Sequence, residues 1–212
     1  MATGVELLDR QPVTPPLGGS GGSGTNTPRG GGEGGPSGFA ADPGRFGLWL
    51  FLGTVSMLFI GFTSAYLVRR ASADWRPLEA PAVLWANTLV LLASSAVLEI
   101  GRRRERRDGG RAALGTVAGA AALGVLFGAG QVLAWRALSG AGVFLYSHPH
   151  SSFFYVLTGV HLAHLAGGLL WFTAALAALW RDAGRRALDL LSTYWHFLGG
   201  LWIYLLLLLF VF

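Results

Sequence analysis

Residues 152–180 read SFFYVLTGVHLAHLAGGLLWFTAALAALW, a run without a single Asp, Glu, Lys or Arg. As an α-helix this run would extend ~43 Å at a rise of ~1.5 Å per residue, whereas the hydrocarbon core of a bilayer is about 30 Å thick. We therefore predict a transmembrane helix here, which tilts or projects beyond the membrane.

Four more apolar runs share the chain with this one, separated by short polar connections. They lie at about 46–68, 82–100, 112–137 and 188–212. About 20 apolar residues are enough for a helix to cross the bilayer, and each run reaches that length. We predict an all-α fold: an integral membrane bundle of five transmembrane helices over residues 45–212.

Residues 1–44 differ from the rest of the chain because Gly, Pro, Ser and Thr dominate their composition. Such a segment cannot bury enough apolar surface to offset the entropy lost on ordering. We predict a disordered N-terminal tail that precedes the membrane domain.

Overall composition excludes several classes of function. The chain is 52% hydrophobic and only 13% charged, which excludes an ordinary soluble domain. Its 16 basic residues, all Arg, gather at the ends of the apolar runs, so they orient helices and do not indicate a nucleic-acid partner. The absence of cysteine excludes disulfides, Cys-ligated iron–sulfur clusters and thiolate copper sites.

The arginines predict the orientation of the helices. The connection at 101–111 (GRRRERRDGGR) carries six of them and the connection at 181–186 (RDAGRR) carries three. Short loops rich in Arg stay in the cytoplasm. With five spans, the N-terminal tail then lies inside and Phe212 outside, with 12 Arg on the inner side and 4 on the outer side.

Glu99 is an acidic residue at the last turn of the second predicted span. It precedes the arginines at 102–104 by three to five residues, so we expect ion pairs at the membrane surface. No Asp, Glu or Lys lies at mid-membrane, which argues against ion-coupled transport through carboxylates of this chain.

Two glycine pairs stand in the third run, in GTVAG (115–119) and GVLFG (124–128). A four-residue spacing of small residues removes bulk from one face of a helix. Both pairs therefore predict close packing against a neighbouring helix.

His161 and His164 raise the question of a metal or haem site, because their spacing places both on one helix face. His196, near the start of the last run, is the third candidate. A catalytic zinc or non-haem iron site normally adds a carboxylate or an open water position, and no carboxylate lies nearby. Haem ligands come from opposed helices, so positions 161 and 164 cannot both bind one iron. We favour neutral histidines that form hydrogen bonds between helices, as do Ser94, Ser95 and Gln131.

An alternative remains, in which the chain is a self-contained membrane haem or metal redox protein that uses His161, His164 and His196. His148 and His150, beside Pro149, belong to the predicted outer loop. We expect both to be interfacial and solvated.

Five strings, taken in order, resemble subunit III of the haem–copper cytochrome c oxidases. The most specific, SSFFYVLTGVHLAHLAGG (151–168), matches the family signature Phe-Tyr-x-Leu-Thr-Gly-x-His-x-x-His. The others are FGLWLFLGTVSMLFIGFTSAYLVRR (46–70), LWANTLVLLASSAVLE (84–99), GAGQVLAWRAL (128–138) and YWHFLGGLWIYLLLLL (194–209). Shorter bacterial members of the family have five spans with the N-terminus inside, the topology that the arginines predict.

The resemblance implies an accessory subunit of an aerobic respiratory oxidase, which reduces oxygen with electrons from cytochrome c and translocates protons. The haems and copper would lie in partner subunits I and II, with no cofactor in this chain. It would stabilise the catalytic subunit, bind phospholipid and reside in the bacterial cytoplasmic membrane. A subunit III of a quinol oxidase is a further alternative.

The resemblance assigns no residue to catalysis, cofactor binding or metal binding. Arg69 and Arg70 are candidates for lipid headgroup contacts or for capping the first helix. The membrane carboxylates common in the family are missing, because Val55 and Gly199 stand at the matching positions. The candidates for interhelical hydrogen bonds or lipid contacts are Tyr66, Asn87, Gln131, His161, His164, Trp195 and His196. We expect His161→Leu or His164→Leu to perturb assembly or stability more than haem content.

Overall fold

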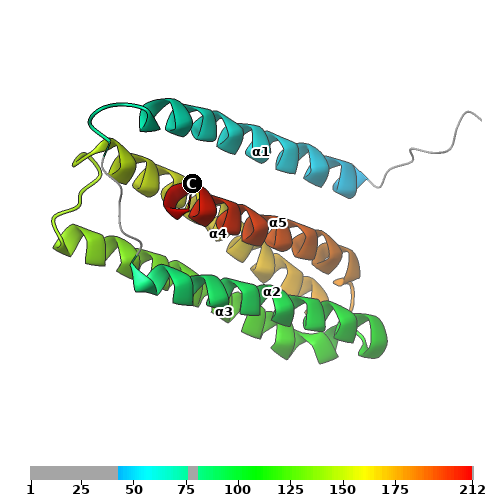
Figure 1. The fold of residues 1–212 in the computed structure, drawn as a ribbon. Helices are drawn as coiled ribbons and strands as arrows, with labels where there is room; N and C mark the ends of the chain where they lie inside the picture. Colours follow the sequence, from blue (N-terminus) through cyan, green and yellow to red (C-terminus); the bar gives the residue numbers. More distant parts are fainter. Residues whose placement is uncertain (1–42, 76–80, 212) are drawn as a thin grey trace, which may run out of the picture. The chain divides into compact units, whose positions relative to one another are not determined.

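The computed structural model describes residues 43–75 and 81–211, and every regular element within them is an α-helix. All five helices are long and apolar enough to cross a membrane, which confirms the predicted all-α bundle. The helices are α1 (Pro43–Arg70), α2 (Ala82–Asp108), α3 (Gly110–Gly140), α4 (Pro149–Trp180) and α5 (Arg185–Phe210) (Figure 1). The predicted disordered tail lies outside the described residues, except that its last two positions already belong to α1.

The helices extend beyond the predicted apolar runs. The second helix continues to Asp108 through the Arg-rich segment, because Arg and Glu are good helix formers. Gly109 alone separates it from the third helix, with φ of 88°, a left-handed value that favours glycine. α4 starts at Pro149, where the missing N–H costs nothing, and the backbone N–H of His148 donates to the Ser151 hydroxyl (3.2 Å).

α5 is the central helix, since it packs against α1, α2 and α4. Half of its most apolar window is buried, against 22–28% in the other four helices. The second and third helices form an antiparallel hairpin, and α4 packs against both α3 and α5, whereas α1 packs against α4 and α5 (Figure 1). α5 therefore forms the centre of the packing.

Trp195 of α5 occupies the middle of the packing. Its ring is completely buried and lies edge-on to Phe172 of α4 (4.8 Å between centroids). A Cβ added at Gly124 or Gly168 would lie 2.7 and 3.0 Å from this ring. Two helices thus approach α5 closely because glycine leaves room for the indole.

Of the two glycine pairs predicted to pack against a neighbouring helix, one does so fully and the other only in part. Gly124 and Gly128 face Trp195 and Leu162 respectively, which confirms the second pair. At Gly115 an added Cβ meets nothing within 4 Å, and at Gly119 it meets a Val97 methyl at 3.9 Å. The prediction is wrong for Gly115, because a four-residue spacing shows which positions share a face but not which face meets a neighbour.

Candidate functional site

Trp195 joins three helices through a chain of hydrogen bonds. Its indole N–H donates to the Ser94 hydroxyl of α2 (3.0 Å), which donates to the Ala120 carbonyl of α3 (2.8 Å). All the side-chain atoms involved are buried. Each donor therefore has a protein acceptor in a region where water is scarce.

Asn87 links the second and third helices. Its buried side-chain amide donates to the Phe127 carbonyl (3.0 Å). The amide fills the space beside Gly130, where an added Cβ would overlap it. At the next residue of α2, the Thr88 hydroxyl accepts from the Trp202 indole (2.9 Å), which adds a second link from α5 to α2.

His161 and Gln131 depart from this pattern. Both are almost fully buried, yet neither ring nitrogen of His161 and neither amide atom of Gln131 has a hydrogen-bond partner among the described residues. The His161 ring packs instead against the rings of Phe127 (6.1 Å) and Trp202 (5.3 Å). The interhelical hydrogen bonds expected for these two side chains are not formed.

His164 is half-buried and bonds within its own helix. Its Nδ1 lies 2.8 Å from the Val160 carbonyl, which can only accept, so Nδ1 carries the proton. The backbone carbonyl of His164 makes the link between helices, because the Tyr194 hydroxyl donates to it (2.8 Å). The ring faces Phe51 and Phe59 of α1, at 6.4 and 6.0 Å.

The three histidines of the redox alternative do not converge. His161 is buried among aromatic rings and His164 lies beside α1, while His196 is exposed on α5. Within residues 43–75 and 81–211, no group of three or more His, Asp or Glu side chains has an arrangement that could hold a metal ion. The shared helix face of positions 161 and 164 therefore does not become a ligand set.

At the end of the bundle where α1 stops, an aromatic cluster contains a histidine. His150 is 3% exposed, stacks on Trp75 (4.9 Å, 17°) and lies 3.0 Å through Nε2 from the Leu209 carbonyl. The buried Tyr66 ring packs edge-on against Trp75 (5.1 Å) and Phe153 (5.5 Å). The predicted solvation is wrong for His150, because the segment after α1 and the end of α5 cover it.

Arg69 and Arg70 end α1, where cationic side chains interact favourably with the helix dipole. The Arg69 guanidinium donates to Asp74 (2.6 Å). Hydrogen bonds from Ser72 and Arg69 hold the pKa of the Asp74 carboxyl below its usual value of 3.8. Arg69 is thus engaged within the chain, and Arg70 is exposed on the same turn.

At the opposite end, a network of ion pairs ties α2 to α5. Glu99 pairs with Arg102 (2.7 Å) and Arg103 (3.0 Å), as predicted. Asp189 of α5 accepts from Arg102 (3.3 Å) and Arg106 (2.8 Å). The predicted pairing of Glu99 with Arg104 is wrong, because Arg104 points across the hairpin and donates to Thr116 of α3 (3.0 Å).

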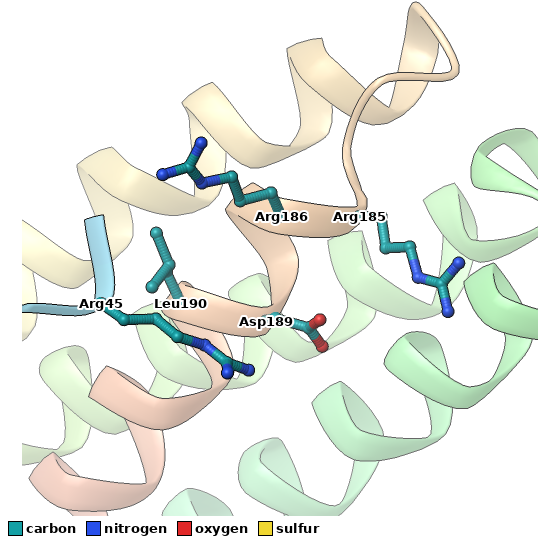
Figure 2. Close-up of a pocket in the computed structure, with 5 residues that line it drawn as sticks. All are labelled: Arg45, Arg185, Arg186, Asp189 and Leu190. Carbon is teal, nitrogen blue, oxygen red and sulfur yellow. The ribbon is translucent and has the colours of Figure 1, made fainter. Parts of the chain in front are cut away.

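Beside this network lies an open pocket of about 260 Å³, lined by Arg45, Arg185, Arg186, Asp189 and Leu190. Arg45 reaches it from α1 and the other residues from the start of α5, and the guanidinium groups of Arg185 and Arg186 point away from one another (Figure 2). Three arginines and one carboxylate line the pocket, and that carboxylate, Asp189, is already paired with α2. Sequence reasoning missed the pocket, although the predicted orientation placed all three arginines on one side.

Comparison with known proteins shows to which family the chain belongs. The chain is 31% identical over 179 residues to cytochrome c oxidase subunit 3 of a Synechocystis strain, covering 78% of this chain and 74% of the relative. It is also 31% identical over 177 residues to the same subunit of Thermostichus vulcanus, covering 78% and 85%. The chain belongs to the cytochrome c oxidase subunit III family.

One similar protein belongs to an oxidase that is named for ubiquinol in place of cytochrome c. Subunit 3 of the cytochrome bo(3) ubiquinol oxidase of Pseudomonas aeruginosa is 28% identical over 167 residues, covering 74% of this chain and 79% of the relative. No family model matches the chain.

The structure shows where this subunit III departs from the expected family pattern. Val55, at one position where a carboxylate is common, is buried in α1. Gly199, at the other, faces α2, where an added Cβ would lie 3.5 Å from the Ser95 hydroxyl. Both positions face the protein interior, so a carboxylate at either one would project between helices.

Proposed function

We propose that this chain is the accessory, non-catalytic subunit III of a haem–copper terminal oxidase in the aerobic respiratory chain. It assembles with subunits I and II, which hold the haems and copper, and supports oxygen reduction coupled to proton translocation. The proposal rests on the separation in space of the three histidines in the membrane helices. His161, His164 and His196 lie in three separate environments, and the described residues include no group of three or more His, Asp or Glu side chains that could hold a metal ion, which supports a role in packing.

Phospholipid binding is part of this proposed role. The pocket between the starts of α1 and α5 presents Arg45, Arg185 and Arg186 at one end of the bundle. Arginine side chains at helix ends reach toward the membrane surface, where anionic headgroups lie. We assign this pocket to a lipid phosphate, and the exposed Arg70 to a headgroup at the other surface.

We also propose that the chain crosses the bacterial cytoplasmic membrane with its N-terminus inside and its C-terminus outside. Residues 101–111, where α2 meets α3, and residues 181–186, where α4 meets α5, carry nine arginines and are then cytoplasmic. In this orientation the Arg45 pocket and the Asp189 network face the cytoplasm, and the cluster around His150 faces outward.

The test is to purify the full-length chain from its native membrane in a mild detergent through a C-terminal tag. We expect two oxidase subunits to co-purify, with haem and copper stoichiometric to the catalytic subunit. Stripping this chain from the complex should leave haem per catalytic subunit unchanged and shorten the active lifetime during turnover. A chain that purifies without oxidase subunits, or that carries haem by itself, would overturn the proposal.

The electron donor can be read from the same preparation. We expect reduced cytochrome c to support oxygen consumption by the complex, given the greater identity to the cytochrome c oxidase relatives. Consumption with a quinol and none with cytochrome c would assign the chain to a quinol oxidase.

A further inference from the structure

One face of the central helix is open to its surroundings. Although α5 is the most buried of the five helices, a stripe along it is exposed. Its members recur at intervals of three or four residues, the spacing of a single helix face. The α5 stripe consists of Thr193, His196, Gly200, Ile203 and Leu207.

His196, the second member of this stripe, stands near the midpoint of α5. It is the twelfth of the 26 residues of α5, so it lies ~17 Å along the axis from Arg185 at a rise of ~1.5 Å per residue. The arginines and Asp189 mark one end of the helix, and the residues from 201 to 210 are all apolar except Tyr204. The imidazole therefore lies inside the predicted membrane span, about two helical turns beyond Asp189.

An outward imidazole at this depth is costly in a lipid environment. Ionisable side chains within membranes almost always face a protein interior or a water-filled cavity. His148, His150 and His164 each have a hydrogen-bonding contact within the protein, but no such contact is found for the His196 ring among the described residues. Its N–H would have no acceptor against acyl chains, so this face calls for a polar neighbour.

The surface around His196 also suits the approach of a helix. Gly200 follows one turn later, and a Cβ added there would meet nothing within 4 Å. Gly200 also lines an apolar groove of about 360 Å³ between α5 and α1. On the α1 side, Phe59 and Ile60 line the same groove. A small residue beside a polar one is the combination that favours close contact between transmembrane helices.

We propose that the α5 stripe docks against a transmembrane helix of a partner oxidase subunit, which offers a hydrogen-bonding side chain to His196 within the membrane. The inference rests on the proposed function, since it requires assembly with an oxidase. It goes further by naming which face of the bundle is the interface. The neutral imidazole has one donor and one acceptor, so the partner side chain is a hydroxyl, an amide or an indole.

Photo-crosslinking in the intact complex tests the position of this face. A benzophenone amino acid replaces Ile203 in the stripe, which leaves His196 in place. The matched control replaces Leu126, which is 54% exposed and lies at the midpoint of α3. We expect irradiation to join position 203 to an oxidase subunit with a yield several times that of position 126.

The outcome separates this inference from the proposed function. Co-purification of the oxidase tests the function, whereas the pattern of adducts tests the face. An equal or greater yield from position 126, an adduct with a second copy of this chain, or lipid adducts alone from position 203 would overturn the inference while the function stands.

The role of the imidazole itself is tested by His196→Leu and His196→Gln in the full complex. We expect the leucine variant to lower the ratio of bound to free chain after a detergent wash about threefold, the average value of one interhelical hydrogen bond. Glutamine retains a donor and an acceptor, so it should restore most of the binding. Unchanged retention in the leucine variant, or equal loss in both variants, would contradict a hydrogen bond at this position.

Discussion

The first helix and the group formed by α2, α3 and α5 are held in the bundle by different means. In the three-helix group, buried donors meet acceptors on the neighbouring helix, as Trp195 does with Ser94 and Asn87 with Phe127. α1 is attached mainly by ring contacts, such as Phe51 with Tyr194 (6.0 Å), and by a hydroxyl pair. Its apolar window is also the least buried, at 22%.

This difference follows from the physics of packing in lipid. Acyl chains are as apolar as a leucine side chain, so apolar contact alone gives little preference for helix over lipid. Hydrogen bonds and glycine-mediated close approach determine which helices stay together. The three-helix group is therefore the rigid part of the domain, and α1 is the part that a lipid or partner can most easily displace.

The largest effect on stability is expected where an added side chain disrupts the close packing of the three-helix group. In Gly124→Leu, even the Cβ would lie 2.7 Å from the Trp195 ring, which is fully buried and cannot move aside. We expect a loss of about 3 kcal/mol in unfolding free energy, the upper part of the range for overpacked cores. Thermal unfolding of the full chain in detergent, followed by circular dichroism, measures it.

The matched control is Gly115→Leu on the same helix. An added Cβ at Gly115 meets nothing within 4 Å, so its unfolding temperature should equal or exceed that of the wild type. Equal losses in the two variants would show that Trp195 does not set the packing.

The next effect has the opposite sign. His161 has no hydrogen-bond partner among the described residues, so His161→Leu removes a buried polar ring and leaves an aliphatic side chain among aromatic rings. We expect a gain of about 1 kcal/mol, at the lower end of the cost of an unsatisfied buried polar group. Haem per catalytic subunit in the complex should stay constant.

The sequence alone led to the expectation that His161→Leu perturbs assembly or stability, and the buried environment reverses the expected sign. A variant that unfolds at a lower temperature than the wild type would show that the His161 ring does have a partner in the membrane. Loss of haem with assembly intact would favour the redox alternative.

A smaller loss is expected when one hydrogen bond between helices is removed without a change in volume. Asn87→Leu deletes the amide that donates to the Phe127 carbonyl, while Leu fills nearly the same space beside Gly130. Hydrogen bonds of this kind in membrane proteins contribute about 0.6 kcal/mol on average. Unfolding in detergent should show a loss of that size, and a loss as large as that of Gly124→Leu would mean that polar contacts dominate over packing.

The number and order of the helices were predictable from the sequence, because hydropathy is a property of the chain in one dimension. The extensions at the ends were not, since the helical Arg-rich segment after residue 100 is polar and depends on propensity and on pairing with Glu99 and Asp189. Periodicity also placed His161 and His164 on one face correctly. It could not show that aromatic rings surround His161 while α1 covers His164.

The remaining errors concern contacts between segments far apart in the chain. His150 was expected in solvent because it belongs to the predicted outer loop, but Trp75 and Leu209 cover it. The pocket lined by Arg45 and Arg185 joins the starts of two helices that are about 140 residues apart. Such sites depend on which helices pack together, and hydropathy does not determine that.

Loosening α1 is expected to cost little. The Thr63 hydroxyl has a single proton, which it donates to the Phe59 carbonyl (2.8 Å), so it accepts from the Tyr204 hydroxyl (2.8 Å). Tyr204→Phe removes that donor and leaves Thr63 bonded within its own helix. We expect a loss of at most about 0.5 kcal/mol in detergent unfolding, because both hydroxyls lie at an exposed edge. A loss of unfolding free energy greater than that of Asn87→Leu would contradict the view that α1 is held less firmly than the three-helix group.

The smallest effect is expected at the connection after α1, where Asp74 pairs with Arg69 at the surface. Because the pKa of Asp74 is lowered on folding, its contribution to stability is complete above the unfolded value of 3.8 and is lost as the pH falls through the lower folded pKa. Exposed pairs contribute little, so Asp74→Asn should unfold within error of the wild type or slightly below it. Any difference between the two should persist from about pH 7 to about pH 5 and vanish only in stronger acid. A difference that disappears already near neutral pH would mean that another titrating group, and not this carboxylate, stabilises the end of α1.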